Sequence, residues 1–266
     1  MWLDELVGRY TLQVLGVGAA EDPEHNDSDD ISEGQLTGGI LKRTEDHRVA
    51  HIEDIFDRII TSNYLKHCAD EEQYIEYHDS TPSELQRFQS FEWKLNVVDK
   101  PGVINAMCVP GGKMIIFTGI LKEVVDSDDE CAAIICHEIG HALCRHGMEA
   151  MQWRLMWIAA VYVIITMMGI DLSWLVDRLL YVGVNMLLQL PMSRRAELEA
   201  DEIAIYLMEE SGYDLDALVT VMQKLGEVED RLGKVPEVIS THPLTDNRVH
   251  ILKEKIAARR EVIMKK

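Results

Sequence analysis

The chain has 266 residues, of which 47% are hydrophobic, so it is long enough for one domain with a substantial core. Its formal net charge of -20 argues against a nucleic-acid partner, because phosphate binding requires clustered Lys and Arg side chains. Five cysteines without a CxxC pair argue against a disulfide framework and fit a reducing compartment better.

Residues 1–90 are predicted to form an N-terminal helical appendage. The first ten residues, MWLDELVGRY, are acidic where a signal peptide is basic, and they lack the Arg- and Ser-rich character of a transit peptide, so no targeting sequence is visible. Residues 21–30 (EDPEHNDSDD) are expected to form an exposed acidic loop. Apolar residues at helical spacing within 45–66 predict an amphipathic helix that packs on the core, and Ser83 is expected to cap a shorter helix.

A small sheet is predicted next. Apolar and alternating runs indicate strands at 91–98, 103–109 and 113–118, with a Pro-Gly-Gly turn at 110–112. A short helix is expected after the third strand, and Asp128 or Asp129 is expected to cap the helix that follows. Such a sheet can simply support that helix, or its exposed edge strand can pair with an extended peptide.

Residues 131–148 (CAAIICHEIGHALCRHGM) predict a buried helix that carries the motif HEIGH. His137 and His141 are four residues apart and therefore share one helix face, where both imidazoles can reach one metal ion. Glu138 lies at the edge of that face, where it can accept a proton from a water molecule. Two ordinary histidines beside a solvated glutamate are the alternative, but the apolar neighbours weigh against it, because buried ionisable groups need partners.

The remainder of this helix is not expected to supply a further ligand. The extended pattern HExxHxxGxxH would require Gly and His at positions where the chain has Cys144 and Gly147. His146 is five residues from His141, which turns it away from the ligand face, so we expect it to lie behind the ligands or to be exposed. The cysteines of this helix, Cys131, Cys136 and Cys144, are interpreted as small buried residues rather than as thiolate ligands.

A third metal ligand has to come from elsewhere, because a catalytic zinc usually takes three protein ligands. Residues 193–204 (SRRAELEADEIA) place Glu197 and Asp201 four residues apart on one helix face, with Glu199 and Glu202 pointing elsewhere. A glutamate here could complete a His2Glu site, and Asp201 could orient a ligand histidine. Alone, the segment is more typical of a solvated acidic face, but its pairing with HEIGH favours the ligand interpretation.

Four ordered motifs carry a family resemblance: NAMCVPGGKMIIFTGIL, HEIGH, SRRAELEAD and STHPLTDNRV. They resemble the zinc metallopeptidase family that includes HtpX and the CAAX prenyl proteases, and within it the Oma-type peptidases of the mitochondrial inner membrane and their bacterial relatives. The resemblance covers residues 90–255 approximately. It implies a mainly α fold with a small sheet (α+β), in which a zincin-like domain over residues 91–266 carries an HExxH helix and a downstream ExxxD helix.

Position by position, the resemblance implies one Zn²⁺ ion per chain, bound by His137, His141 and Glu197, with Glu138 as the general base. Asp201 would lie behind the ligands. Arg194 or Arg195 matches a basic position there, although a salt bridge between helices is the alternative for this arginine.

The same resemblance extends to the substrate. His242 matches a family histidine near the active site that contacts the substrate or the tetrahedral oxyanion, and the alternative is a capping or surface histidine. The substrate would lie extended along an edge strand that comprises Asn105, Ala106, Met107, Cys108 and Val109.

Residues 155–190 contain two uncharged runs, 155–170 and 179–190, on either side of a charged turn. A membrane-spanning helix needs about 20 apolar residues, and both runs are shorter. Because His137 and Glu197 must reach the same metal, the chain has to return to the side from which it left, which excludes a single crossing. A two-pass hairpin, a re-entrant or interfacial hairpin and a wholly buried helical pair remain. Charges at Asp171, Asp177 and Arg178 are costly in lipid, so an in-plane or re-entrant membrane attachment is favoured among them.

Together these features predict a zinc-dependent metalloendopeptidase that hydrolyses membrane-associated or misfolded proteins in protein quality control, at the mitochondrial inner membrane by resemblance. One alternative is a catalytically silent, zinc-stabilised membrane scaffold or chaperone, which would have no need of a base such as Glu138. Another is a different zinc amidohydrolase, which lacks its upstream cysteine ligand here and leaves Glu197 unexplained.

Overall fold

The computed structural model describes residues 40–41, 47–69, 83–109, 111–167, 193–232, 242 and 246–264. Its helices are α2 (His47–Ala69), the 3-10 helix η1 (Ser83–Ser90), α4 (Thr118–Glu123), α5 (Asp128–Cys144), α6 (His146–Met167), α8 (Arg194–Ser211), α9 (Asp216–Leu232) and α11 (Asp246–Met264). Its strands are β1 (Ile40–Leu41), β2 (Lys94–Val98), β3 (Ala106–Val109) and β4 (Lys113–Phe117). The predicted fold class, mainly α with a small sheet, is confirmed.

The strand order in the sheet is β1-β2-β4-β3, with β2 and β4 parallel and the other two pairs antiparallel. β3 is therefore an edge strand of the described sheet. The predicted strands are present but shorter. Asn105 lies just before β3; its backbone carbonyl accepts from Phe117 N, and its side-chain Oδ1 accepts from Ala106 N. Gly111 and Gly112, with φ of 90° and 86°, make the tight turn between β3 and β4.

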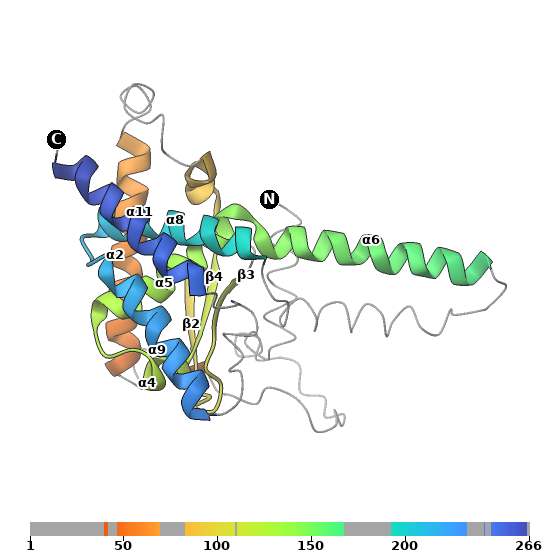
Figure 1. The fold of residues 1–266 in the computed structure, drawn as a ribbon, viewed down its shortest axis with the longest axis horizontal. Helices are drawn as coiled ribbons and strands as arrows, with labels where there is room; N and C mark the ends of the chain where they lie inside the picture. Colours follow the sequence, from red (N-terminus) through yellow and green to blue (C-terminus); the bar gives the residue numbers. More distant parts are fainter. Residues whose placement is uncertain are drawn as a thin grey trace, which may run out of the picture.

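Helix α5 is the centre of the fold, packed against α8, α9, α2 and β3 (Figure 1). The apolar face of α2, with Ile52, Ile55, Phe56 and Ile59, lies in the same core as α5 and α8. α5 and α8 approach especially closely at Gly140, where a Cβ atom would lie 2.7 Å from the Ala200 carbonyl oxygen. This close approach brings the ligand-bearing faces of the two helices together.

The helix ends are set by short polar side chains. Ser127, rather than the predicted Asp128 or Asp129, caps α5 by accepting from Glu130 N, because Asp128 and Asp129 already lie in the first helical turn. α5 ends at Cys144; its C-cap residue Arg145 has a left-handed φ of 61°, and α6 begins at the next residue. Ser193 caps α8 in the same way. The predicted acidic loop at 21–30 lies outside the described residues.

Helix α6 extends away from the body of the molecule (Figure 1). Several of its large apolar side chains face solvent: Trp153, Met156, Trp157, Ile164 and Met167. Within the described part of the chain, no helix combines the length and the apolar character needed to cross a bilayer. The second apolar run, 179–190, lies outside the described residues.

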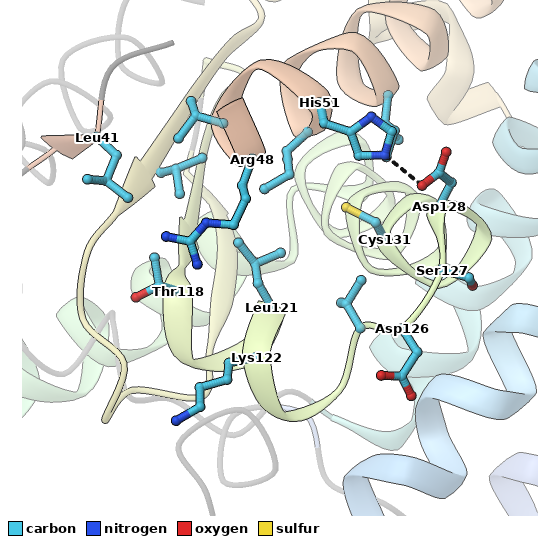
Figure 2. Close-up of a pocket in the computed structure, with 15 residues that line it drawn as sticks. Leu41, Arg48, His51, Thr118, Leu121, Lys122, Asp126, Ser127, Asp128 and Cys131 are labelled. Carbon is cyan, nitrogen blue, oxygen red and sulfur yellow. Dashed lines mark hydrogen bonds and ion pairs between the residues drawn. The ribbon is translucent and has the colours of Figure 1, made fainter. Parts of the chain in front are cut away.

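A cavity of about 450 Å³ lies between α2, α4 and the N-terminal end of α5 (Figure 2). Apolar side chains such as Val49, Ile52 and Leu121 form its walls. His51 and Asp128 form a hydrogen bond of 2.7 Å at its edge. No residue of HEIGH lines this cavity, so the candidate metal ligands lie elsewhere, toward the C-terminal end of α5.

Candidate metal centre and active site

The histidines of HEIGH and the glutamate of α8 meet at one point. The Nε2 atoms of His137 and His141 are 3.1 Å apart. The carboxylate of Glu197 faces both, with Oε2 3.5 Å from His137 Nε2 and Oε1 3.3 Å from His141 Nε2. All three residues are shielded from solvent, since their side chains are 13%, 4% and 1% exposed. Two nitrogen atoms and a carboxylate converging in this way form a His2Glu donor set.

His242 joins this group from the segment before α11. Its Nδ1 atom lies 3.0 Å from Glu197 Oε1, and its Nε2 atom lies 3.4 Å from Glu138 Oε1. One ligand atom from each of His137, His141, Glu197 and His242 lies within 4.8 Å of the others. His242 therefore bridges the donor set and the proposed general base, and its buried position does not match the surface-histidine alternative.

Asp201 orients His137. Its Oδ1 atom accepts from His137 Nδ1 at 3.0 Å, and because a carboxylate only accepts, Nδ1 carries the hydrogen and Nε2 presents a lone pair to the donor set. Arg248 of α11 neutralises the carboxylates: Nε and Nη2 donate to Asp201 at 2.8 Å each, and Nη1 lies 2.5 Å from Glu197 Oε2. The buried guanidinium beside the site is thus Arg248, whereas Arg194 and Arg195 are exposed.

His141 has a longer chain of partners that the sequence did not reveal. Its Nδ1 atom is 2.9 Å from Nδ1 of the buried His146, whose Nε2 lies 3.1 Å from Glu199 Oε2. Glu199 only accepts, so His146 Nε2 carries hydrogen, His146 Nδ1 accepts, and His141 Nδ1 donates. Arg195 Nε in turn donates a hydrogen bond to Glu199 Oε1 at 2.7 Å. Both histidines of HEIGH consequently present Nε2 to the donor set.

Comparison with known proteins agrees with this geometry. The model of Peptidase family M48 matches residues 63–256. The chain belongs to this family. It is 36% identical over 165 residues to mitochondrial metalloendopeptidase OMA1 of Arabidopsis thaliana, covering 62% of this chain and 32% of the relative. It is 33% identical over 163 residues to the Schizosaccharomyces pombe protein of the same name, covering 61% and 46%.

A bacterial protein is also similar. The beta-barrel assembly-enhancing protease of Yersinia pestis is 28% identical over 151 residues, covering 55% of this chain and 31% of the relative. The chain spans less than half the length of these three relatives. The expected resemblance to the Oma-type peptidases and their bacterial relatives is confirmed.

The residues of this M48 chain fit the family's zinc ion. Glu197 Oε2 is buried and accepts no well-aligned hydrogen bond from any described group, although Arg248 Nη1 is close. The Nε2 atoms of His137 and His141 face each other at 3.1 Å, close enough to share one proton or to bind one cation in its place. Imidazole and carboxylate ligands are those that zinc takes in catalytic sites. His137, His141 and Glu197 would hold the ion, with His242 also within reach of it.

The surroundings of the His2Glu donor set shift the pKa of each of its three residues. Burial raises the pKa of Glu197, but hydrogen bonds with His137, His141 and His242 outweigh it and hold that pKa far below its usual range. Burial lowers the pKa of His137, but hydrogen bonds to Asp201 and Glu197 raise it to about 9. Burial lowers the pKa of His141 well below its usual value, so this ring is neutral and able to act as a ligand.

Glu138 has the environment of a stronger base than an ordinary carboxylate. Its side chain is buried, and burial raises its pKa, while the nearby His242 and His137 lower it. A raised pKa makes a carboxylate a better proton acceptor. A hydrogen bond from the Cys108 backbone also reaches Glu138, which places β3 directly beside it. A cavity of about 40 Å³ adjoins Glu138, with apolar walls that include Ile134, Leu218 and Met222.

Proposed function

We propose that this chain is a zinc-dependent endopeptidase that cuts proteins at or near a membrane as part of protein quality control. The observation that carries the proposal is the buried Glu138, which lies between the His2Glu donor set and an edge strand. A structural metal site would not need a base at this position. The names of the relatives, which describe metalloendopeptidases, support the same activity.

In the proposed mechanism, zinc when bound supplies Lewis acidity that polarises the scissile carbonyl and makes water a better nucleophile. Glu138 takes a proton from the attacking water and later delivers it to the leaving amine nitrogen. Asp201 and His146 hold the rings of His137 and His141 in the orientation that presents Nε2. His242, 3.4 Å from Glu138, is placed to stabilise charge on the substrate oxygen.

The substrate is proposed to add to the sheet along β3. This strand pairs with β4 on one side only within the described sheet, and it packs against α5. Backbone hydrogen bonds to an edge strand would hold a peptide extended beside Glu138 whatever its sequence, which suits a protease of misfolded proteins. Residues 105–109 would supply this surface, with Met107 and Cys108 half-buried and Asn105 fixing the start of the strand.

Cleavage of casein by the purified full chain, beside Glu138→Gln, tests this proposal. Wild type is expected to cut, while the variant retains zinc but loses activity by about a hundredfold or more, because the other buried carboxylates of the described site, Glu197 and Asp201, are held by the histidines and Arg248. Zinc content is measured in both proteins. If both hold zinc and neither cuts, a silent scaffold is supported instead. Release of only a small acyl group from model substrates would support a different amidohydrolase.

Membrane attachment through α6 and the apolar segment after it is part of the proposal. From residue 155 to its end α6 carries no charged residue, which is typical of a buried or a lipid-contacting environment, and α6 extends away from the body of the protein. Relatives from plant and yeast are named as mitochondrial, which supports a mitochondrial location; the inner membrane is proposed from the family resemblance of the sequence motifs. Carbonate extraction of isolated mitochondria tests it: recovery in the pellet is expected, and recovery in the supernatant contradicts membrane attachment.

A further inference from the structure

A second group of potential metal ligands lies behind His141. The ligand atoms of Cys144, His146 and Glu199 lie within 4.8 Å of one another. The sequence favoured a buried apolar role for the cysteines of α5, and Cys131 and Cys136 are indeed 3% and 0% exposed. Cys144 differs because it is only half-buried and shares this position with an imidazole and a carboxylate.

The backbone explains how the three residues meet. Cys144 is the last residue of α5 and His146 is the first of α6, and the left-handed Arg145 between them turns the chain so that both approach α8. Glu199 projects from α8 toward His146 Nε2, at 3.1 Å. Tetrahedral zinc sites separate their ligand atoms by about 3.3–3.8 Å, so a contraction of roughly 1 Å would complete the geometry. Half-buried Cys144 and Glu199 have room for that adjustment.

We infer that Cys144, His146 and Glu199 form a second, regulatory site for a thiophilic divalent cation such as Zn²⁺ or Co²⁺. Thiolate, imidazole and carboxylate are a donor set that these cations accept, with solvent in the remaining position. Arg195, which now holds Glu199, competes only weakly, because its side chain is 88% exposed and such surface pairs contribute little.

Occupancy of this site would act on the catalytic centre through one hydrogen bond. A cation on His146 Nε2 replaces the hydrogen there, and the neutral ring then carries its hydrogen on Nδ1. His141 Nδ1 also carries a hydrogen when its Nε2 faces the zinc ligands. Two N–H groups cannot share a hydrogen bond, so the second cation removes the contact that orients His141. Excess metal should therefore inhibit the enzyme. This inhibition rests on the proposed function, whereas metal binding at the second site is independent of it.

Cobalt titration of the metal-free full chain tests the inference. The His2Glu set contains no sulfur, so the first equivalent of Co²⁺ should give no thiolate-to-cobalt charge-transfer band, and the second equivalent should give one. Cys144→Ser, which preserves the size of the side chain, should lose the band. Cys108→Ser, at another half-buried cysteine, is the matched control and should keep it. Absence of the band in wild type, or its persistence in Cys144→Ser, overturns the inference.

Casein cleavage during the same titration tests regulation separately. Activity of wild type should fall at least severalfold as the second equivalent binds, while Cys144→Ser, which lies outside the catalytic machinery, stays active at that metal concentration. An equal loss in both proteins overturns the regulatory role. A chain that shows the Cys144-dependent band but never cuts casein would leave the second site established and contradict the proposed endopeptidase function instead.

Discussion

Arg248 is the buried cation that neutralises the carboxylates of the described site. It is only 4% exposed and contacts two buried carboxylates, those of Asp201 and Glu197. Burial raises the pKa of Asp201, but hydrogen bonds from Arg248 outweigh it and hold the pKa at about 2. Both carboxylates thus stay ionised at neutral pH, as ligand and orienting group must.

Replacing Arg248 by methionine should destabilise the metal-free protein by about 3–5 kcal/mol, because it leaves buried carboxylates without their cation. Urea unfolding followed by circular dichroism measures the change. Arg260→Met is the matched control, since Arg260 pairs with Asp214 and Asp216 at the surface and should cost no more than about 1 kcal/mol. Similar losses in the two variants would contradict this account.

His146 is predicted to act on zinc affinity without touching the ion. Its replacement by alanine removes the acceptor for His141 Nδ1, so zinc affinity should fall about 10- to 100-fold, the usual cost of losing a partner that orients a ligand. Competition with a chromogenic chelator measures the affinity. His250→Ala, which changes an exposed histidine of α11, should leave it unchanged. An unaltered affinity in His146→Ala would show that His141 needs no such partner.

At the scale of elements, the α5–α8 contact sets the distance between ligands. Gly140 allows it, because any Cβ at that position would meet the Ala200 carbonyl oxygen at 2.7 Å and its Cα at 3.1 Å. Backbone atoms cannot move aside without shifting α8, and Glu197 and Asp201 would move with that helix. Glycine is otherwise a poor helix residue, so its presence here reflects packing rather than helix stability.

Gly140→Ala should therefore destabilise the protein by about 1–3 kcal/mol despite the gain in helix propensity, and it should also weaken zinc binding. Gly147→Ala is the matched control, since a Cβ there meets nothing within 4 Å. In the first turn of α6 that change should be neutral or stabilising by up to about 1 kcal/mol. Thermal unfolding with and without zinc compares the two variants, and a stable, fully metal-binding Gly140→Ala protein would disprove the packing argument.

Local spacing determined which parts of the site the sequence could predict. His137 and His141 repeat on one helix, as do Glu197 and Asp201, so their shared faces follow from 3.6 residues per turn. Arg248 and the link from His146 to Glu199 depend on how separate helices cross, which no local pattern records. His146 was expected to lie behind the ligands or outside, and its spacing alone could not choose. The Ser127 cap was missed because acidic residues that follow a cap also suit a first turn.

At the scale of the whole molecule, the fold class followed from the sequence but the course of the apolar segment did not. Strand and helix periodicity indicated a small sheet followed by helices, and the structure has that order. The apolar character of the segment after HEIGH suits a core hairpin as well as a lipid-contacting one, and the sequence favoured membrane attachment only through the charges between its two runs. Its first part is a helix that extends away from the core with its tryptophans exposed, which favours lipid contact.

Trp153 and Trp157 of α6, at 64% and 70% exposure, should therefore contribute strongly to vesicle binding. Burying about 60 Å² of each indole in lipid would contribute ~1.5 kcal/mol, or about tenfold in partitioning per residue. Cosedimentation of the full chain with liposomes should fall accordingly in the double variant Trp153→Ser, Trp157→Ser. The matched control, Val262→Ser with Met264→Ser, removes exposed apolar side chains from the end of α11 and should bind like wild type.

Light scattering without lipid tests the competing explanation, that the exposed side chains of α6 form a protein–protein interface. If the tryptophan variant bound vesicles as well as wild type but broke an oligomer into smaller species, the exposed side of α6 would contact a second copy rather than lipid. If it lost vesicle binding while its mass in solution stayed the same, α6 would be the membrane-attaching element. The latter result is expected, because an in-plane attachment keeps the His2Glu centre outside the bilayer, within reach of water and of membrane-associated substrates.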